Sequence, residues 1–184
     1  MGRPKAALPS PDHGECRSLA QRTAGILAGV TGPVVEVGPG YSGLPHVSED
    51  PPGGGPLMAV AAGARELLSI GWPGPAVVLA TDMPLLEVGL VEWLASHPAP
   101  HSVIPVVGGM AQPLCARYDR NALDAAIAIT EAGGRAMKDL LSAVDHTLVG
   151  PEEWAAHGID ASWFTDADTP GDLEACAREE RDRA

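Results

Sequence analysis

The stretch AVVLATDMPLL, residues 76–86, constrains the fold more than any other part of this sequence. Residues 76–80 are apolar at every position, which is typical of a strand buried on both faces of a sheet. Asp82 follows, and Pro84 ends the extended run before a helical pattern begins. Because ligands of open α/β sheets bind at the carboxyl ends of strands, Asp82 is the first candidate for a functional residue.

Apolar, β-branched runs alternate with longer helical patterns along the rest of the chain, which predicts a mostly parallel sheet with helices on both faces. The expected strands are Pro33–Val37, His46–Glu49, Ala76–Thr81, Ser102–Val107, Leu114–Tyr118, Thr147–Val149 and Trp163–Thr165. The expected helices are Ser18–Ala28, Pro56–Ile70, Glu87–Ser96, Arg120–Glu131, Ala136–Ala143, Pro151–His157 and Pro170–Arg181. No segment resembles an interdomain linker, so we expect residues 1–184 to form a single domain.

The charge of the chain limits the partners that it can have. The formal net charge of −12 would repel nucleic acids and anionic membrane surfaces. An anionic substrate would therefore need a local site of fixed cations, backbone N–H groups or a metal ion, and the sequence has only two lysines, Lys5 and Lys138. Three distant cysteines without a CxxC pair, and no apolar run near the ~18–20 residues of a membrane span, make the cytoplasm the expected compartment.

Asp82 and Asp50 each follow an expected strand. An aspartate in the position of Asp82 commonly binds Mg²⁺, which takes oxygen ligands from one or two carboxylates and from substrate phosphates. The alternative for Asp82 is that it caps the following helix. Asp50 precedes the loop PPGGGP, where Pro56 opens a helix whose N-terminus could bind a phosphate or a polar base edge. The alternative for that loop is a flexible connector.

The stretch FTDADTPGDLEA, residues 164–175, is a third candidate. Thr169 before Pro170 is a capable N-cap, and Asp172 suits the first helical turn. A structural role therefore explains these residues, but it does not explain Asp168 immediately before them.

Six stretches, in order and over nearly the whole chain, resemble the nucleotidyltransferases with a Rossmann-like fold. They are MGRPKAAL, EDPPGGGPLMA, ATDMPLL, AQPLCARY, EAGGRAMKDLL and DADTPGDL. The chain is most similar to the molybdenum cofactor guanylyltransferases within that MobA-like family. The resemblance implies a three-layer α/β fold, and Mg²⁺ as the cofactor.

The resemblance also implies roles for individual residues. Lys5 corresponds to the signature lysine that binds nucleotide phosphates as a point charge. Asp50 corresponds to the aspartate that contacts guanosine, and Asp82 to the magnesium ligand. Further nucleotide contacts are implied for Gly55, Pro56 and Leu57, and substrate contacts for Gln112, Arg135 and Asp168. Gln112 could instead be a satisfied amide at a strand edge, and Arg135 a solvated residue of a first helical turn.

The implied reaction transfers GMP from Mg-GTP to the terminal phosphate of molybdopterin and releases pyrophosphate. Molybdoenzyme chaperones or other proteins of cofactor biosynthesis are the partners that such an enzyme would have. Pro4 and the stretch DADTP depart from the guanylyl pattern and look like the related cytidylyltransferases. Transfer of CMP to the same cofactor is therefore one alternative, and a non-catalytic protein that binds nucleotide or cofactor is another.

The family's opening signature is a strand, a Gly-Gly loop and an arginine before a stretch like RMGxDK, and this sequence supplies only its end. We therefore expect a gap where the first, central strand of the sheet belongs. Unpaired backbone groups inside the protein would cost roughly 1–3 kcal/mol each. The expectation is that Met1 is internal and that about 10–20 further residues, one strand and its loop, precede it.

Overall fold

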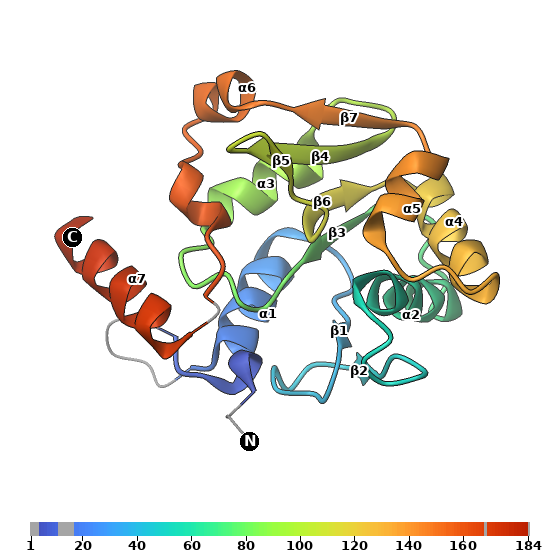
Figure 1. Cartoon of the computed structure of the whole chain (residues 1–184), viewed down its shortest axis with the longest axis horizontal. Coiled ribbons are helices and arrows are strands. Elements are labelled where there is room, and N and C mark those ends of the chain that lie inside the picture. Colours follow the sequence, from blue (N-terminus) through green and yellow to red (C-terminus); the bar gives the residue numbers. More distant parts are fainter. Residues whose placement is uncertain (1–3, 11–16, 168, 184) are drawn as a thin grey trace.

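The computed structural model describes residues 4–10, 17–167 and 169–183. Figure 1 shows the described elements as a layered α/β arrangement. In chain order they are η1 (Lys5–Ala7, a 3₁₀ turn), α1 (Leu19–Val30), β1 (Glu36–Val37), β2 (His46–Val47), α2 (Pro56–Ser69), β3 (Ala76–Leu79), α3 (Val88–Ser96), β4 (Ser102–Val107), β5 (Met110–Ala111), β6 (Cys115–Tyr118), α4 (Arg120–Glu131), α5 (Met137–Ala143), β7 (His146–Val149), α6 (Pro151–Ala156), η2 (Ala161–Phe164, a 3₁₀ turn) and α7 (Pro170–Arg183).

All the expected helices form, most of them within two residues of the expected ends. The expected strand Trp163–Thr165 is wrong, because this segment belongs to the 3₁₀ turn η2. The carboxylate of Asp160 accepts a hydrogen bond from the Ser162 N–H and so starts the turn. Strand β5, which was not expected, follows a two-residue turn at Gly108 and Gly109, both with positive φ. A glycine pair between apolar residues is typical of such a hairpin.

The main sheet has the strand order β3-β6-β4-β7, with β5 paired to β4. Strand β7 is parallel to β4, whereas β6 is antiparallel to both β3 and β4. The expectation of a mostly parallel sheet is therefore correct only in part. The reason is the tight hairpin after β4, which reverses the chain direction before it enters β6.

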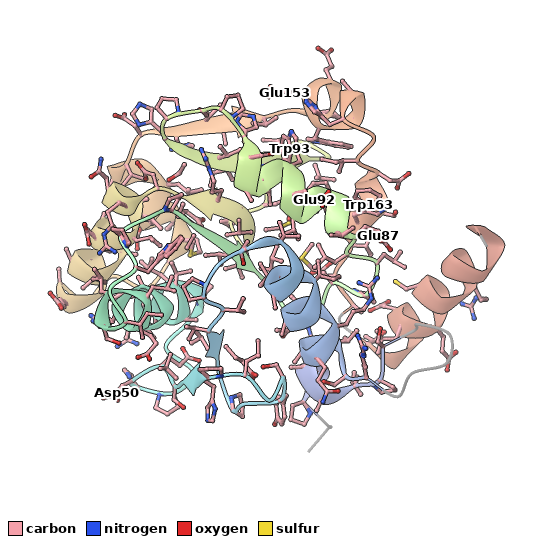
Figure 2. The ribbon with its side chains drawn as sticks, turned by 180° about the vertical axis from the view of Figure 1, so that it is seen from behind. Asp50, Glu87, Glu92, Trp93, Glu153 and Trp163 are labelled. Carbon is pink, nitrogen blue, oxygen red and sulfur yellow. The ribbon has the colours of Figure 1, made fainter. Side chains whose placement is uncertain are left out.

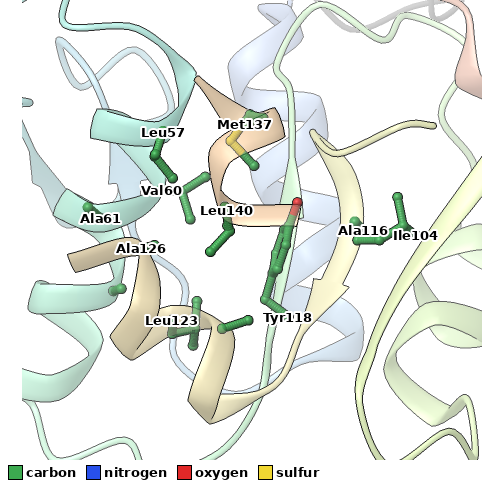
Figure 3. Packing of buried hydrophobic residues seen from close by; sticks show 12 residues of the cluster. Leu57, Val60, Ala61, Ile104, Ala116, Tyr118, Leu123, Ala126, Met137 and Leu140 are labelled. Atoms are coloured by element: carbon green, nitrogen blue, oxygen red, sulfur yellow. The ribbon is translucent and has the colours of Figure 1, made fainter. Parts of the chain in front are cut away.

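Helices cover both faces of the main sheet, as expected from the sequence. On one face, α2, α4 and α5 pack on Ile104, Ala116 and Tyr118, and Figure 3 shows this cluster from close by. On the other face, α3, α6 and η2 pack on alternate strand residues such as Val103 and Cys115, with side chains of α1 against them. Consecutive residues of β4 and β6 thus enter opposite cores, because side chains alternate along a strand.

Arg117 of β6 holds the loop between α3 and β4 in place through side-chain hydrogen bonds. Its guanidinium is buried and donates to the backbone oxygens of His97 and His101 at 3.0 Å each, and to that of Ala99. The ring of His97 is buried too, and its Nε2 lies 2.8 Å from Oε1 of Glu153 on α6. Figure 2 labels Glu153 of α6 and Trp93 of α3, which lie toward the same end of the molecule.

Strands β1 and β2 form a separate parallel pair, bonded to no strand of the main sheet among the described residues. After β1 the chain wraps around the carboxylate of Glu36, which accepts hydrogen bonds from the N–H groups of Gly40, Tyr41 and Ser42. Burial raises the pKa of this carboxyl, but the bonds from Ser42, Tyr41 and Gly40 outweigh burial and hold the pKa below its ordinary value.

Strand β3 differs from its expectation in one respect. Each of its residues, Ala76–Leu79, is only partly buried, whereas the apolar sequence predicted burial on both faces. The expectation was wrong because β3 is bonded to β6 on one side and faces a cavity on the other.

No helix in the described ranges has the length and apolar character needed to cross a membrane.

Candidate active site

The structure brings Lys5 and Asp82 together, although they lie far apart in the sequence. Lys5 Nζ lies 3.5 Å from Asp82 Oδ2, and the two side chains are 42% and 27% exposed. Both side chains remain accessible to a ligand while their opposite charges are close. The pair therefore offers a cation and a carboxylate to one phosphate-bearing ligand.

Two backbone bonds hold the segment that carries Asp82. After β3 ends at Leu79, the N–H of Ala80 donates to the Leu114 oxygen at 2.7 Å. The oxygen of Asp82 itself accepts from the N–H of Ala167 at 2.8 Å. Helix α3 begins only at Val88, after Glu87, so Asp82 is not the cap of that helix. The structural alternative for Asp82 is thereby removed.

The start of α2 lines the same cavity as this pair. Gly55 precedes the helix with φ at 98°, a conformation that favours glycine, and Pro56 occupies the first turn. Pro56 lines the same cavity as Lys5 and Asp82. The Leu57 side chain is completely buried in the core (Figure 3), so only its backbone N–H can contact a nucleotide.

The backbone of Arg135 lies next to the start of α2. A Cβ built on Gly55 would lie 3.4 Å from the Arg135 oxygen, so the two loops are in contact. The Arg135 side chain is exposed. This position leaves both of its expected roles open, as a phosphate ligand and as a solvated residue.

The remaining candidates are Asp50 and Gln112, which do not line the cavity that Lys5 and Asp82 share, and Asp168. Asp50 is exposed on the loop between β2 and α2 and is not part of the cavity wall (Figure 2). Gln112 is half-buried, and its Nε2 donates to the Met110 oxygen at 3.3 Å, which satisfies one donor of the amide. Asp168 lies outside the described residues. The cap after it is as expected, because Thr169 and Asp172 hydrogen-bond each other's backbone N–H.

A cavity of about 590 Å³ adjoins the pair, and its volume is in the range of small-molecule sites. Its walls are largely apolar and come from β1, β3, α1 and α2. We refer to it as the inter-sheet cavity. It lies between β1 and β3, where the sequence analysis expects a gap in the sheet.

The donor set fits a magnesium ion bound through one protein carboxylate. In the part of the chain that the structure describes, no three His, Cys, Asp or Glu side chains gather into a complete metal site. Mg²⁺ does not need one, because it keeps several waters and binds through one or two carboxylates plus substrate phosphates. Asp82, partly exposed at a strand end, meets that requirement.

The chain matches known proteins in sequence and in structure. Residues 1–148 match the family model described as the MobA-like NTP transferase domain. A protein of Mycobacterium tuberculosis named "Probable molybdenum cofactor guanylyltransferase" is 35% identical over 152 residues, 79% of this chain and 74% of that protein. A protein of Chloroflexus aggregans with the same name is 30% identical over 132 residues, 70% of this chain and 62% of that protein.

Two solved structures share the fold. Molybdopterin-guanine dinucleotide biosynthesis protein A from Archaeoglobus fulgidus has a TM-score of 0.75 at 19% identity, covering 98% of this chain and 91% of that one. The 2-C-methyl-D-erythritol 4-phosphate cytidylyltransferase from Thermus thermophilus has a TM-score of 0.65 at 18% identity, covering 96% and 94%. At these identities the structures support the α/β architecture rather than a particular substrate.

Proposed function

Because the chain belongs to the MobA-like NTP transferase family, we propose that this nucleotidyltransferase transfers GMP from Mg-GTP to the terminal phosphate of molybdopterin. The observation that carries the proposal is the Lys5–Asp82 pair at the end of β3, partly exposed on the wall of a cavity. The names of the two sequence relatives support guanosine over other bases.

In the proposed reaction an oxygen of the molybdopterin phosphate attacks the α-phosphorus of GTP. A new P–O bond forms there, the bond to the β-phosphate breaks, and pyrophosphate leaves with that bonding pair. The attacking phosphate monoester is already ionised near neutral pH, so the site needs no strong general base. Catalysis then depends on positioning and on neutralising charge.

The residues of the pair would divide that task. The Lys5 ammonium would bind phosphate oxygens of the nucleotide, which matters in a chain of net charge −12. Asp82 would hold Mg²⁺, which supplies additional positive charge for the phosphates. The N-terminus of α2, with Gly55 and the Leu57 N–H, would present backbone donors and the positive end of the helix dipole.

Base selection is proposed for Asp50. A carboxylate can accept hydrogen bonds from both N1–H and the N2 amino group of guanine, whereas cytosine offers it only the N4 amino group. Asp50 is exposed and therefore accessible for such a contact. Gln112, Arg135 and Asp168 are proposed to contact the pterin substrate or its phosphate.

The proposal also includes the setting of the reaction. The enzyme would act in the cytoplasm and pass its product to molybdoenzyme chaperones or other proteins of cofactor biosynthesis. The buried, free thiol of Cys115 supports a reducing compartment.

Replacing Asp82 by Asn tests the proposal most directly. This change keeps the size of the side chain and removes its charge, so kcat/KM for GMP transfer should fall by about 100-fold or more while the melting temperature stays unchanged. The measurement is pyrophosphate release and formation of the dinucleotide, with molybdopterin and either GTP or CTP over a range of Mg²⁺ concentrations.

Asp145→Asn is the matched control, because Asp145 is exposed and lies far along the chain from the site. Near-full activity of Asp82→Asn with GTP would remove Asp82 from the mechanism. Preference for CTP over GTP in the unaltered protein would favour the cytidylyltransferase alternative. Saturable GTP binding without product would favour a non-catalytic binding protein.

A further inference from the structure

Helix α1 contacts both segments that carry the Lys5–Asp82 pair. It packs against η1, which contains Lys5, and against α3, which follows Asp82 in the chain (Figure 1). The start of α1 is fixed by a capping box, in which the side chains of Ser18 and Gln21 each accept a hydrogen bond from the other's backbone N–H. The first turn of α1 therefore has a defined geometry to which both segments can be bonded.

The Lys5 segment is bonded to α1 through its backbone. The N–H of Leu8, immediately after η1, donates to the Lys5 oxygen at 2.9 Å. The Leu8 oxygen accepts in turn from the N–H of Leu19, the first residue of α1, at 2.9 Å. The N–H of Ser10 donates to the Arg17 oxygen at 2.7 Å. Main-chain bonds thus fix the position of η1 relative to α1.

The Asp82 segment is bonded to the beginning of α1 through the side chain of Arg22. A turn follows Asp82 directly and is closed by the Leu86 N–H, which donates to the Met83 oxygen at 3.2 Å. The oxygen of Leu86 accepts a hydrogen bond from Nη1 of Arg22. The turn after Asp82 is therefore closed within itself, and its last residue is held by α1.

Of the two contacts that the Arg22 guanidinium makes with this segment, the one with the backbone carries more of the interaction. Its Nη2 lies 3.4 Å from Oε1 of Glu87, but the Glu87 side chain is 47% exposed, and ion pairs in such positions contribute little. The Arg22 side chain is only 9% exposed, and its bond to the Leu86 oxygen is buried. Loss of that bond would leave a buried acceptor without its charged donor.

We propose that Arg22 is a positioning residue, which holds the turn Met83–Leu86 against α1 and so sets the position of the Asp82 carboxylate relative to Lys5. The inference rests on the proposed function, because it concerns the two residues that would bind Mg²⁺ and the nucleotide phosphates. Arg22 is not part of the wall of the inter-sheet cavity, so it acts through the backbone rather than by contact with substrate. A displacement of a reacting or metal-binding group by about 1 Å is enough to slow catalysis strongly.

The test compares Arg22→Met, which keeps the apolar stem and removes the guanidinium, with two control variants. Glu87→Gln removes the ion pair and leaves the bond to the Leu86 oxygen. Ile104→Ala lowers the general stability of the protein, because Ile104 is completely buried in the cluster on the other face of the main sheet from Leu86. If Arg22→Met does not fold, Arg22→Lys takes its place, because it keeps a cation and lacks the planar fork.

Amide hydrogen exchange is measured without nucleotide, so that this result does not depend on the proposed function. The N–H groups of Leu86 and Ala167 report on the Asp82 segment, because one closes the turn and the other donates to the Asp82 oxygen. The Leu123 N–H in α4 is the reference for general stability. Exchange at the two reporters should accelerate by about tenfold more than at Leu123 in Arg22→Met, and by about threefold more in Arg22→Lys. The two controls should leave these ratios unchanged.

Kinetics of GMP transfer form the second measurement. In Arg22→Met, kcat should fall by about tenfold or more and the Mg²⁺ concentration for half-maximal rate should rise, because Asp82 is displaced. The KM for GTP should change by less than about threefold, because Lys5 keeps its position. The two controls should keep the kcat of the unaltered protein.

Unchanged exchange ratios in the Arg22 variant would overturn the proposal. An equal change in Glu87→Gln would also overturn it, because the ion pair would then be responsible. So would an equal fall of kcat in Ile104→Ala, because general loss of stability would then explain the effect. If the unaltered protein transferred no GMP, the proposed function would be wrong, and the exchange ratios would still decide whether Arg22 holds the Asp82 segment.

Discussion

Strands β3 and β4 carry similar apolar sequences, but their surroundings differ. Strand β4 lies between β6 and β7, and the side chains of Val103 and Ile104 are completely buried. Strand β3 has β6 on one side and the inter-sheet cavity on the other, and all four of its residues are partly exposed. An apolar residue is suited to a core, but strand residues are completely buried only where the strand has a neighbour on both sides.

The largest effect that would sharpen this comparison is expected at Arg117 of β6, the strand that pairs with both β3 and β4. Arg117→Met keeps most of the apolar stem and removes the donors to the oxygens of His97, Ala99 and His101. Because all three acceptors would lose their partner, and the bond to His97 is buried, the free energy of unfolding should fall by about 3 kcal/mol. Urea denaturation measures it, and a loss below about 1 kcal/mol would mean that water replaces the guanidinium.

The second prediction compares the same substitution, valine to alanine, on β4 and on β3. Val103→Ala on β4 should lower the free energy of unfolding by about 2–3 kcal/mol, because it opens a hole in a closed core. Val77→Ala on β3 faces the same cluster but borders the cavity, and it should cost less than half as much. Equal losses by thermal and urea denaturation would contradict the comparison between the two strands.

The smallest effect is expected at Glu36, in the β1–β2 region. The pKa of this carboxyl is lowered in the folded protein, so its stabilisation is present above the ordinary value of 4.5 and is lost as the pH falls through the folded value. Glu36→Gln should therefore cost about 1 kcal/mol near pH 7, and the difference from the unaltered protein should shrink below pH 4.5.

Glu92→Gln is the control for that measurement, because Glu92 is exposed on α3 (Figure 2). Its melting temperature should follow the unaltered protein at every pH. A Glu36→Gln difference that persists unchanged at pH 3 would show that the charge of Glu36 does not stabilise the loop after β1.

The helices and the strand β4 could be predicted from sequence because their signals are local. Asp119 caps α4, and its side chain accepts from the Ala122 N–H, as the sequence pattern of a helix start suggests. The prediction of a strand around Trp163 was wrong because a 3₁₀ turn forms there. The Asp160 side chain starts that turn by accepting a hydrogen bond from the Ser162 N–H. The direction of β6 was not predicted, because it depends on the hairpin at Gly108. The periodicity of apolar residues does not reveal where such a turn reverses the chain.

The candidate site was predictable to a different degree. Position alone left Asp82 between a metal ligand and a helix cap, and only the structure shows Lys5 beside it and α3 starting later. The pairing of residues so distant in sequence is a tertiary contact that no local pattern contains. The Leu57 side chain belongs to the core, so the nucleotide contact expected for this residue can be made only by its backbone.

The backbone bond between Ala167 and Asp82 has a further consequence. The family model ends at residue 148, so Ala167 lies in the part of the chain beyond it, and yet it holds the segment that carries the proposed metal ligand. The segment beyond the residues matched by the family model therefore still helps to position Asp82. A truncation after residue 148 would remove this bond from the segment that carries Asp82 and leave, of the two backbone bonds that hold it, only the one between Ala80 and Leu114.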